Sequence, residues 1–215
     1  MIFLIDEKDI IMPYGQFESV GKVAKIFKIK VKDTPILKEV GKFKIEVPDY
    51  KMKEIENSLY NSTSFRNEAA ICNKIITPIL EVVVAKYKPL DLWIEEPFNV
   101  DEKSGLIGSP DYLLAPKTDE GDMGLPPLCV IEAKDEKWKK GWAQALAEMV
   151  AVSKLGAEVC YGVVTTGRAW EFASRVGWAT YFCCPPFNPK IFAVVKLKGP
   201  GSNCFLNITI WVVLQ

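Results

Sequence analysis

A buried strand that ends in two charged residues is the feature that most restricts how this chain can fold. Residues 128–131 (Leu-Cys-Val-Ile) form a continuous apolar run, which is typical of a strand covered on both faces. Glu132 and Lys134 follow this run two positions apart, so on a strand both side chains point to the same face. Charges at the end of a buried strand need a partner, a bound ion or a chemical role.

A third charged residue, Asp111, opens another apolar segment shortly before this strand. It follows the turn sequence of residues 108–110 (Gly-Ser-Pro) and precedes the apolar residues 112–115. The glycines and prolines of residues 117–127 predict a hairpin loop, which would make Asp111 and Glu132 neighbours on adjacent strands. Two close carboxylates repel each other unless a cation lies between them. A divalent metal ion beside a lysine is an arrangement suited to cutting phosphodiester bonds.

Each of these residues also has a simpler interpretation. Glu132 and Lys134 could form a structural ion pair at the end of their strand. Asp111 could be a turn residue, because Pro-Asp is common in turns.

The composition limits the chemistry that the chain can carry out. Its 215 residues, 49% of them hydrophobic, suit one compact α/β domain. The sequence has no histidine, which excludes Ser-His and Cys-His nucleophiles, histidine phosphotransfer and the usual zinc enzymes. Catalysis would therefore depend on carboxylates, lysines and a metal ion.

Cysteine usage and hydropathy predict a cytoplasmic protein. The six cysteines, at positions 72, 129, 160, 183, 184 and 204, form no Cys-x-x-Cys pair and indicate buried thiols in a reducing compartment. No apolar run reaches the ~18 residues of a membrane span. Residues 1–6 are too short and too acidic a segment for a signal peptide.

The net charge of the chain does not indicate a nucleic-acid partner, because 27 acidic residues balance 27 basic ones. Lysines are nevertheless concentrated in residues 22–32 and again in residues 134–140. The first group fits a solvated face of an amphipathic element. In the second group Trp138 lies among lysines, so it could offer an aromatic face for stacking, although packing is the simpler interpretation of this tryptophan.

Hydrophobic periodicity predicts the order of the elements. A helix is expected from residue 65 that bends or ends near Pro78, followed by strands over 90–95, 106–115 and 128–133. A helix over 138–155 and strands over 159–165 and 169–173 complete the series.

The two ends of the chain are expected to add to this series. Residues 1–60 are interpreted as an N-terminal α/β elaboration, with a short helix and a strand within 15–31 and another strand over 43–47. Residues 61–215 form the main domain, whose tail after residue 178 adds one or two β segments. We expect both parts to form one compact unit.

The motif residues resemble those of the PD-(D/E)-x-K nuclease superfamily. Pro110-Asp111 and the sequence Glu-Ala-Lys at 132–134 match its signature in order, and Gln144 lies on the following helix, where many members carry a glutamine. Residues 161–172, with a Gly-Arg turn, look like part of the N-terminal nuclease domain of type I restriction subunits and their stand-alone relatives. The similarity spans roughly residues 64–175. It implies a restriction-endonuclease-like core (αβββαβ) with a central mixed β-sheet flanked by helices.

The resemblance also implies a role for each site residue. Asp111, Glu132 and the backbone carbonyl of Ala133 would bind Mg²⁺ or Mn²⁺, with Glu68 completing the ligand set. Lys134 would orient or activate the attacking water and add positive charge beside the phosphate.

Two of the implied roles have competing interpretations. Gln144 would orient the lysine, the water or a phosphate, or else form an ordinary exposed pair with Glu148. Glu68 would be a metal ligand or only an acid favoured by the helix dipole. Glu148 itself is assigned no role.

The expected function is a metal-dependent endonuclease that hydrolyses DNA, with RNA not excluded. A homodimer is plausible, because cutting both strands of a duplex needs two sites. The rival interpretation is a non-catalytic module of the same fold that binds nucleic acid or protein. A third possibility is an unrelated structural protein, in which Glu132 and Lys134 would pair with each other while Asp111 lies far away.

Overall fold

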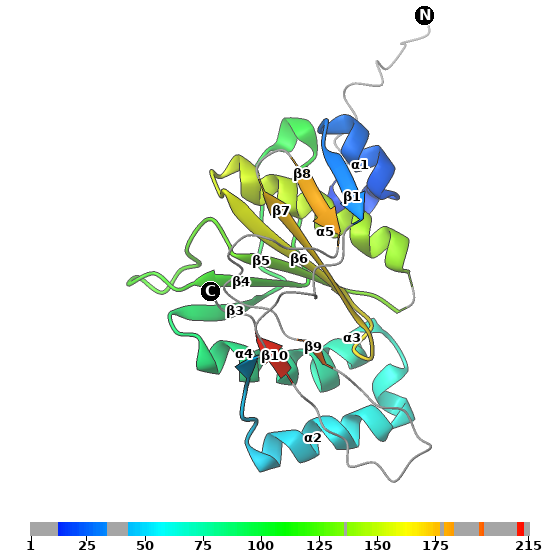
Figure 1. Cartoon of the computed structure of the whole chain (residues 1–215), viewed down its shortest axis with the longest axis vertical. Coiled ribbons are helices and arrows are strands. Elements are labelled where there is room, and N and C mark those ends of the chain that lie inside the picture. Colours follow the sequence, from blue (N-terminus) through cyan, green and yellow to red (C-terminus); the bar gives the residue numbers. More distant parts are fainter. Residues whose placement is uncertain are drawn as a thin grey trace, which may run out of the picture.

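The computed structural model describes residues 13–33, 43–135, 137–176, 179–182, 194–195 and 210–212. These residues form an α/β structure built on a seven-stranded mixed sheet with the strand order β1-β8-β7-β6-β5-β4-β3 (Figure 1). A second, three-stranded sheet has the order β2-β10-β9. The strands are β1 (Lys30–Asp33), β2 (Phe43–Lys44), β3 (Leu90–Ile94), β4 (Tyr112–Pro116), β5 (Cys129–Ala133), β6 (Val159–Thr165), β7 (Trp170–Val176), β8 (Ala179–Phe182), β9 (Val194–Val195) and β10 (Ile210–Val212).

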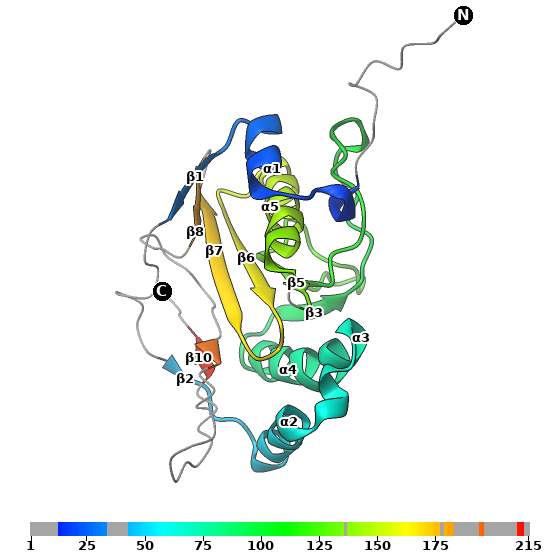
Figure 2. The same ribbon diagram turned by 90° about the vertical axis from the view of Figure 1, so that its right-hand side faces the viewer.

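Helices cover both faces of the large sheet. The α-helices are α1 (Val20–Ile26), α2 (Asp49–Tyr60), α3 (Glu68–Ile71), α4 (Thr77–Lys86) and α5 (Trp138–Lys154). A π-helical turn, η4 (Cys72–Ile76), joins α3 to α4, and the 3₁₀ helices are η1 (Tyr14–Gln16), η3 (Ser62–Phe65) and η5 (Glu102–Ser104). Figure 2 shows α1 and α5 on one side of the sheet, with α3 and α4 on the other.

The element order matches the one expected from the sequence. After α4, strands β3, β4 and β5 pair antiparallel in succession, and β5 then pairs parallel with β6. Parallel neighbours need a crossover connection, and α5 supplies it. The central part of the chain is therefore an α/β unit with the order helix, three strands, helix, strand.

Side chains of β4 and β5 alternate between the two faces of the sheet, so each strand contributes to two hydrophobic cores. Leu113 and Val130 pack with α5 on one face of the sheet. Tyr112, Leu114 and Ile131 point the other way and pack with α3, η4 and α4. Strands β4 and β5 are therefore buried on both faces, as the continuous apolar run before Glu132 predicted.

The register of β4 and β5 sets the position of the charged residues. Tyr112 is opposite Ile131 in this antiparallel pair, so the preceding Asp111 lies beside the following Glu132. The hairpin loop between the strands thus brings together two acids that are 21 positions apart in the sequence.

The first sixty residues contribute to both helical layers and to the sheet. Residues of η1 and α1 belong to the core beside α5, while β1 forms an edge of the large sheet by pairing parallel with β8. Ile55 and Leu59 of α2 pack against the outer side of η4 and α4. Helix α2 was not predicted from the sequence, because most of its side chains are polar and only these two are buried.

The helix predicted from residue 65 continues further than expected. It does not end near Pro78 but runs through the π-helical turn into α4 and ends at Lys86. Pro78 directly follows the π-helical turn near the start of α4, and such a turn is an expected place for a bend in a helix.

Other expectations fall partly on residues outside the described ranges. The strand predicted over 43–47 is limited to β2, and β8, β9 and β10 are the described β segments of the tail. Residues 1–12 and Cys183, Cys184 and Cys204 lie outside the described residues. Cys72, Cys129 and Cys160 are free thiols. In the described residues, every helix is too short or too polar to cross a membrane.

Candidate functional site

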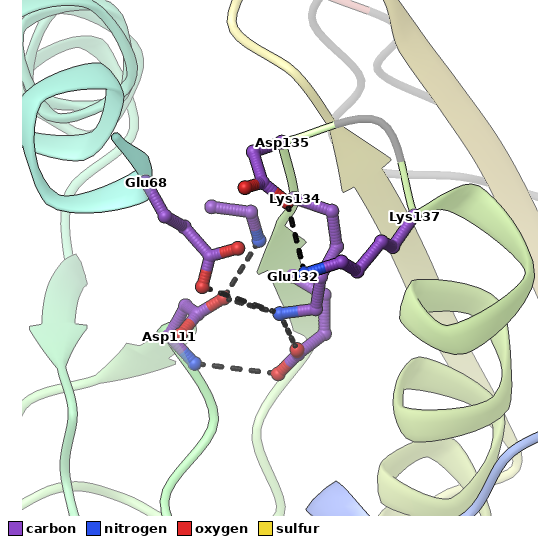
Figure 3. A network of polar contacts seen from close by, with 7 residues as sticks. Glu68, Asp111, Glu132, Lys134, Asp135 and Lys137 are labelled. Atoms are coloured by element: carbon purple, nitrogen blue, oxygen red, sulfur yellow. Dashed lines mark hydrogen bonds and ion pairs between the residues drawn. The ribbon is translucent and has the colours of Figure 1, made fainter. Parts of the chain in front are cut away.

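The predicted motif residues lie together where β4 begins and β5 ends (Figure 3). Glu132 is the penultimate residue of β5, and its side chain is 1% exposed. Asp111 immediately precedes β4, and Lys134 immediately follows β5. Glu68, the first residue of α3, approaches from the helical layer and is 41% exposed. The structure therefore brings together four residues from three segments of the chain.

The Lys134 ammonium lies between three carboxylates. Its Nζ is 2.8 Å from Glu132 Oε2, 3.3 Å from Asp111 Oδ2 and 3.7 Å from Glu68 Oε1. The backbone fixes the two strand acids further, because Asp111 N–H donates to Glu132 Oε1 over 3.4 Å. Ala133 takes part through its amide, which donates to Asp111 Oδ2 over 2.7 Å. Its carbonyl remains a predicted ligand.

A glycine on α5 makes room for the Lys134 side chain. The Lys134 amide donates to the Thr165 carbonyl over 2.8 Å, which keeps the backbone aligned with β6 after β5 ends. The lysine stem then passes Gly141, where an added Cβ would lie 2.8 Å from Lys134 Cγ and 2.8 Å from Val164 Cγ1. No real Cβ contact is that short, so α5 can approach β5 and β6 this closely only with glycine at position 141.

The position of Glu68 satisfies both interpretations of this residue. Asn67 caps α3 by accepting from Ala70 N–H, so Glu68 lies in the first turn, near the positive end of the helix dipole. Its carboxylate also faces Lys134. Partial burial raises the pKa of Glu68, and the charge of Lys134 opposes this increase.

Burial dominates the electrostatics of the two central residues. Desolvation, with repulsion from Asp111, raises the pKa of Glu132 to about 7, although Lys134 acts against the increase. Burial by itself would lower the pKa of Lys134, but attraction to Glu132 and Asp111 outweighs it and raises that pKa. Lys134 is therefore a charged donor at neutral pH.

A fifth charged residue, Glu148, borders the site and was given no role in the sequence analysis. It belongs to α5 and is 1% exposed, and both carboxyl oxygens are buried without a hydrogen-bond donor in the described part of the chain. Burial first, and then the charge of Glu132, raise the pKa of Glu148 well above its usual range. A proton on Glu148 would let it donate to Glu132, which satisfies both groups. The available signal was a single acid among the apolar residues of α5.

Gln144 is not part of this network. It is half-buried on α5, and its Nε2 lies beside Gly15 of η1. No hydrogen bond joins it to the site residues within the ranges that the structure describes. Its predicted role in orienting the lysine, the water or a phosphate therefore stays a prediction.

Packing accounts for the arginine of the Gly-Arg turn. The Arg168 guanidinium lies 3.8 Å from the centre of the Phe65 ring and donates to the Leu59 carbonyl over 3.4 Å. It thereby joins the turn between β6 and β7 to α2 and η3.

The donor chemistry of the site fits a hard divalent cation. Asp111, Glu132 and Glu68 offer carboxylate oxygens, and these three acids face the single positive charge of Lys134. Among the described residues, no three acidic or cysteine side chains are already arranged as a complete metal site. The Lys134 ammonium lies between the three carboxylates of the cluster. A metal ion would have to share this space with Lys134.

Comparisons with known proteins add no assignment. A scan against protein-family models gives no match, and a search of curated proteins finds no similar sequence. Fold and site define the chain as an α/β protein with an acid–lysine cluster at the adjoining ends of two central strands.

Replacing Gly141 with alanine tests the close approach of α5. We expect Gly141→Ala to reduce the free energy of unfolding by about 1–3 kcal/mol, because the new methyl group overpacks against Lys134 and Val164. Gly21→Ala in α1 is the matched control, since nothing lies within 4 Å of its added Cβ, and it should gain up to about 1 kcal/mol. Urea denaturation, monitored by tryptophan fluorescence, measures the free energy of unfolding of both variants. Equal effects of the two substitutions would contradict the packing described for Gly141.

Replacing Glu148 with glutamine tests its protonation. The folded protein retains a proton that the unfolded chain loses above the usual glutamate pKa, so wild-type stability falls as the pH rises through that range. Glutamine resembles the protonated acid and does not titrate. Glu148→Gln should therefore raise Tm more at about pH 8 than at about pH 5, by roughly 2–4 °C for each 1 kcal/mol recovered.

The control for this experiment is an exposed glutamate. Glu120→Gln should show no such pH dependence, because Glu120 lies on the surface of the β4–β5 loop. Melting curves in a chelator, followed by circular dichroism, keep metal ions out of the comparison. The charged groups that act on Glu148 are Glu132, Asp111 and Lys134, and Glu148 in turn acts on Tyr14. A Tm difference that is constant with pH would show that Glu148 is ionised in the folded protein.

Proposed function

We propose that this chain is a metal-dependent nuclease of the PD-(D/E)-x-K type that hydrolyses phosphodiester bonds of DNA. The observation that carries the proposal is the meeting of Asp111, Glu132 and Lys134 at the ends of β4 and β5. These are the motif residues, and they lie within one network of contacts. The element order around them, α4-β3-β4-β5-α5-β6, supports a restriction-endonuclease-like core.

The geometry disfavours a purely structural ion pair. In that case Glu132 and Lys134 would pair with each other while Asp111 lay far away. Instead Asp111 Oδ2 is 3.3 Å from the same ammonium, and Glu68 contributes a third acid from a different layer. Collecting three carboxylates around one lysine leaves an excess of negative charge, which stabilises a folded protein only if another cation or a proton compensates it.

The residues that would hold Mg²⁺ or Mn²⁺ are Asp111, Glu132, Glu68 and the Ala133 carbonyl. When bound there, such an ion supplies Lewis-acid chemistry that lowers the pKa of a water molecule and offsets the charge that develops on the phosphate. Without a cation, the excess carboxylates repel a polyanionic substrate. Nucleic-acid binding close to this cluster is therefore coupled to metal binding.

Lys134 contributes hydrogen bonds and charge, not proton abstraction. The carboxylates of Glu132 and Asp111 raise the pKa of Lys134, so without a bound cation it is a proton donor at neutral pH. Its ammonium can donate to the attacking water or to a phosphate oxygen, where a fixed positive charge stabilises the transition state. Glu132 and Asp111 hold this donor in place, and the stem packed against Gly141 restricts its movement.

The substrate and assembly follow from the resemblance and the composition. DNA is proposed because most nucleases with this motif cut DNA, and Lys137, Lys139 and Lys140 on the adjoining end of α5 suit phosphate contacts. A homodimer would place two sites on the two strands of a duplex. The three free thiols of the described residues agree with the cytoplasmic location that we propose.

The alternative is a non-catalytic module of the same fold that binds nucleic acid or a protein. The observation in its favour is that the Lys134 ammonium already lies between the carboxylates. In such a module the lysine would replace the metal ion permanently. Titration calorimetry with Mn²⁺ separates the two functions, because the module would release no heat of specific binding.

Substitutions in the cluster test the nuclease. Asp111→Ala should lose both Mn²⁺ binding and cleavage, because it removes a ligand. Lys134→Ala should slow cleavage by about 10²–10³-fold while Mn²⁺ affinity stays equal or increases, because the competing cation is gone. Lys134→Arg should not restore the rate, since a guanidinium is broader than an ammonium. Nicking of supercoiled plasmid and of a labelled single strand in Mg²⁺ and in Mn²⁺ measures the rates.

Surface residues provide the matched controls for this experiment. Asp119→Ala and Lys103→Ala remove the same charges from exposed positions away from the cluster and should cut at the wild-type rate. Melting curves in a chelator establish that each variant folds. Cleavage by Lys134→Ala at the wild-type rate would refute the mechanism, and wild-type protein that binds neither Mn²⁺ nor DNA would refute the function.

A further inference from the structure

A pocket between α1 and the start of α5 is lined by two tryptophans. Trp138 and Trp142 are four positions apart on the first turns of α5, so their indoles lie on the same side of that helix. Opposite them are Ser19, Val20 and Gly21 at the start of α1, and Val31 of β1. The pocket measures about 420 Å³, within the range of small-molecule sites, and its walls are mostly apolar.

One of the two tryptophans in the pocket wall is held in place by burial and a hydrogen bond. Trp142 is 7% exposed, and its Nε1 donates to Glu171 Oε2 over 2.6 Å, which fixes the indole plane. Trp138 is half-buried at the edge. A flat aromatic ring could therefore stack against Trp138 without displacing the buried core.

Positive charge surrounds this apolar pocket. Lys139 belongs to its lining and makes no ion pair among the residues that the structure describes. Lys137, which pairs with Asp135 over 3.7 Å, and Lys140 are its neighbours in sequence at the N-terminal end of α5, where cations work against the helix dipole and add to a positive field. Glu18, the residue before Ser19, keeps its negative charge, which Lys22 balances over 3.0 Å and on which Lys140 also acts. An apolar ring attached to an anionic backbone is the ligand that complements both features.

The pocket is adjacent to the acid–lysine cluster along the chain. Gly141, which contacts the Lys134 stem, lies between Trp138 and Trp142 on the same helix. Three helical residues span about 4.5 Å, so the Trp138 indole begins less than one helical turn from the residue that packs on Lys134. Lys137, which acts electrostatically on Glu68, lies between the two sites in sequence.

We propose that this pocket binds an unpaired nucleobase, stacked on Trp138, and that the substrate class is therefore single-stranded or locally unpaired DNA. This inference rests on the proposed nuclease function and names its substrate. A base inside a duplex is stacked on both faces and cannot enter a pocket, whereas a base of a single strand stacks readily on an aromatic side chain. Lys139 would contact the adjoining phosphate.

Fluorescence anisotropy with four labelled DNA ligands of equal length tests the proposal. The ligands are an oligothymidylate, the same strand with abasic residues at its centre, the oligothymidylate paired with its complement, and the paired strand with a central unpaired flap. Binding is measured in Ca²⁺ and in a chelator, with denaturing gels to verify that the strands stay intact. Wild-type protein should bind the two ligands that carry unpaired bases about tenfold more tightly than the abasic strand and the full duplex.

Variants of the pocket should remove this preference selectively. Trp138→Ala should bind base-bearing and abasic strands alike, and Trp138→Phe should keep most of the difference. Gly21→Leu fills the pocket from α1 without removing an aromatic ring, and it should act like Trp138→Ala. Lys139→Gln should weaken the binding of all four ligands equally. It should also reduce the slope of log affinity against log salt concentration by about one, which corresponds to one lost phosphate contact.

The control variant is Tyr60→Ala, which removes an exposed aromatic side chain from the end of α2 and should bind as wild type does. Equal affinity of wild type for base-bearing and abasic strands overturns the proposal. So does a folded Trp138→Ala or Gly21→Leu variant that keeps the preference, which is the result expected if the pocket holds an apolar peptide. If DNA is still cleaved in that case, the nuclease function stands without this pocket. If the wild-type protein binds none of the four DNA ligands, both the proposed nuclease function and the proposed base-binding pocket are wrong.

Discussion

The cost of burying charge is the constraint on which this structure depends. Glu132 is nearly inaccessible to solvent at the end of a strand with apolar neighbours on both faces, and such a carboxylate is stable only with compensation. The Lys134 ammonium supplies most of it, and the backbone amide of Asp111 supplies a further hydrogen bond. The register of β4 and β5 places the Asp111 amide, and the two-residue spacing along one strand places Lys134 on the same face as Glu132. The cluster is therefore a product of strand pairing as much as of the identity of its residues.

The helical layers limit how this cluster can rearrange. On one side α5 lies so close to β5 that Gly141 and Gly162 are needed at the contact, with Met149 packed against the latter. On the other side α3 directs Glu68 toward the lysine from a separate core. The Lys134 side chain therefore contacts both layers, through its stem at Gly141 of α5 and through its ammonium at Glu68 of α3. Electrostatics and packing thus support each other at this end of the sheet.

Local sequence patterns could predict the strands and their order, because apolar runs, turn residues and motif spacing are all local signals. Asp111, Glu132 and Lys134 could be placed together, since a short hairpin loop leaves little freedom in how β4 and β5 pair. Glu148 could not be assigned from the sequence, because its significance depends on how α5 is rotated over the sheet. Helix α2 was missed since only Ile55 and Leu59 mark its buried side. The half-buried position of Gln144 beside Gly15 depends on η1, an element far away in sequence.

The π-helical turn η4 has a geometric consequence for the cluster. A π turn contains one residue more than the corresponding α turn, and each residue of an α-helix advances the direction of its side chain by about 100°. The extra residue therefore changes the phase between α3 and α4. As a result, α4 can direct Leu80 and Val84 into the sheet while Glu68, one turn before η4, faces the strand ends. In an uninterrupted α-helix the twelve steps from Glu68 to Leu80 would leave their side chains about 120° apart, and the extra residue of the turn brings them to within about 20°, so that both face the sheet.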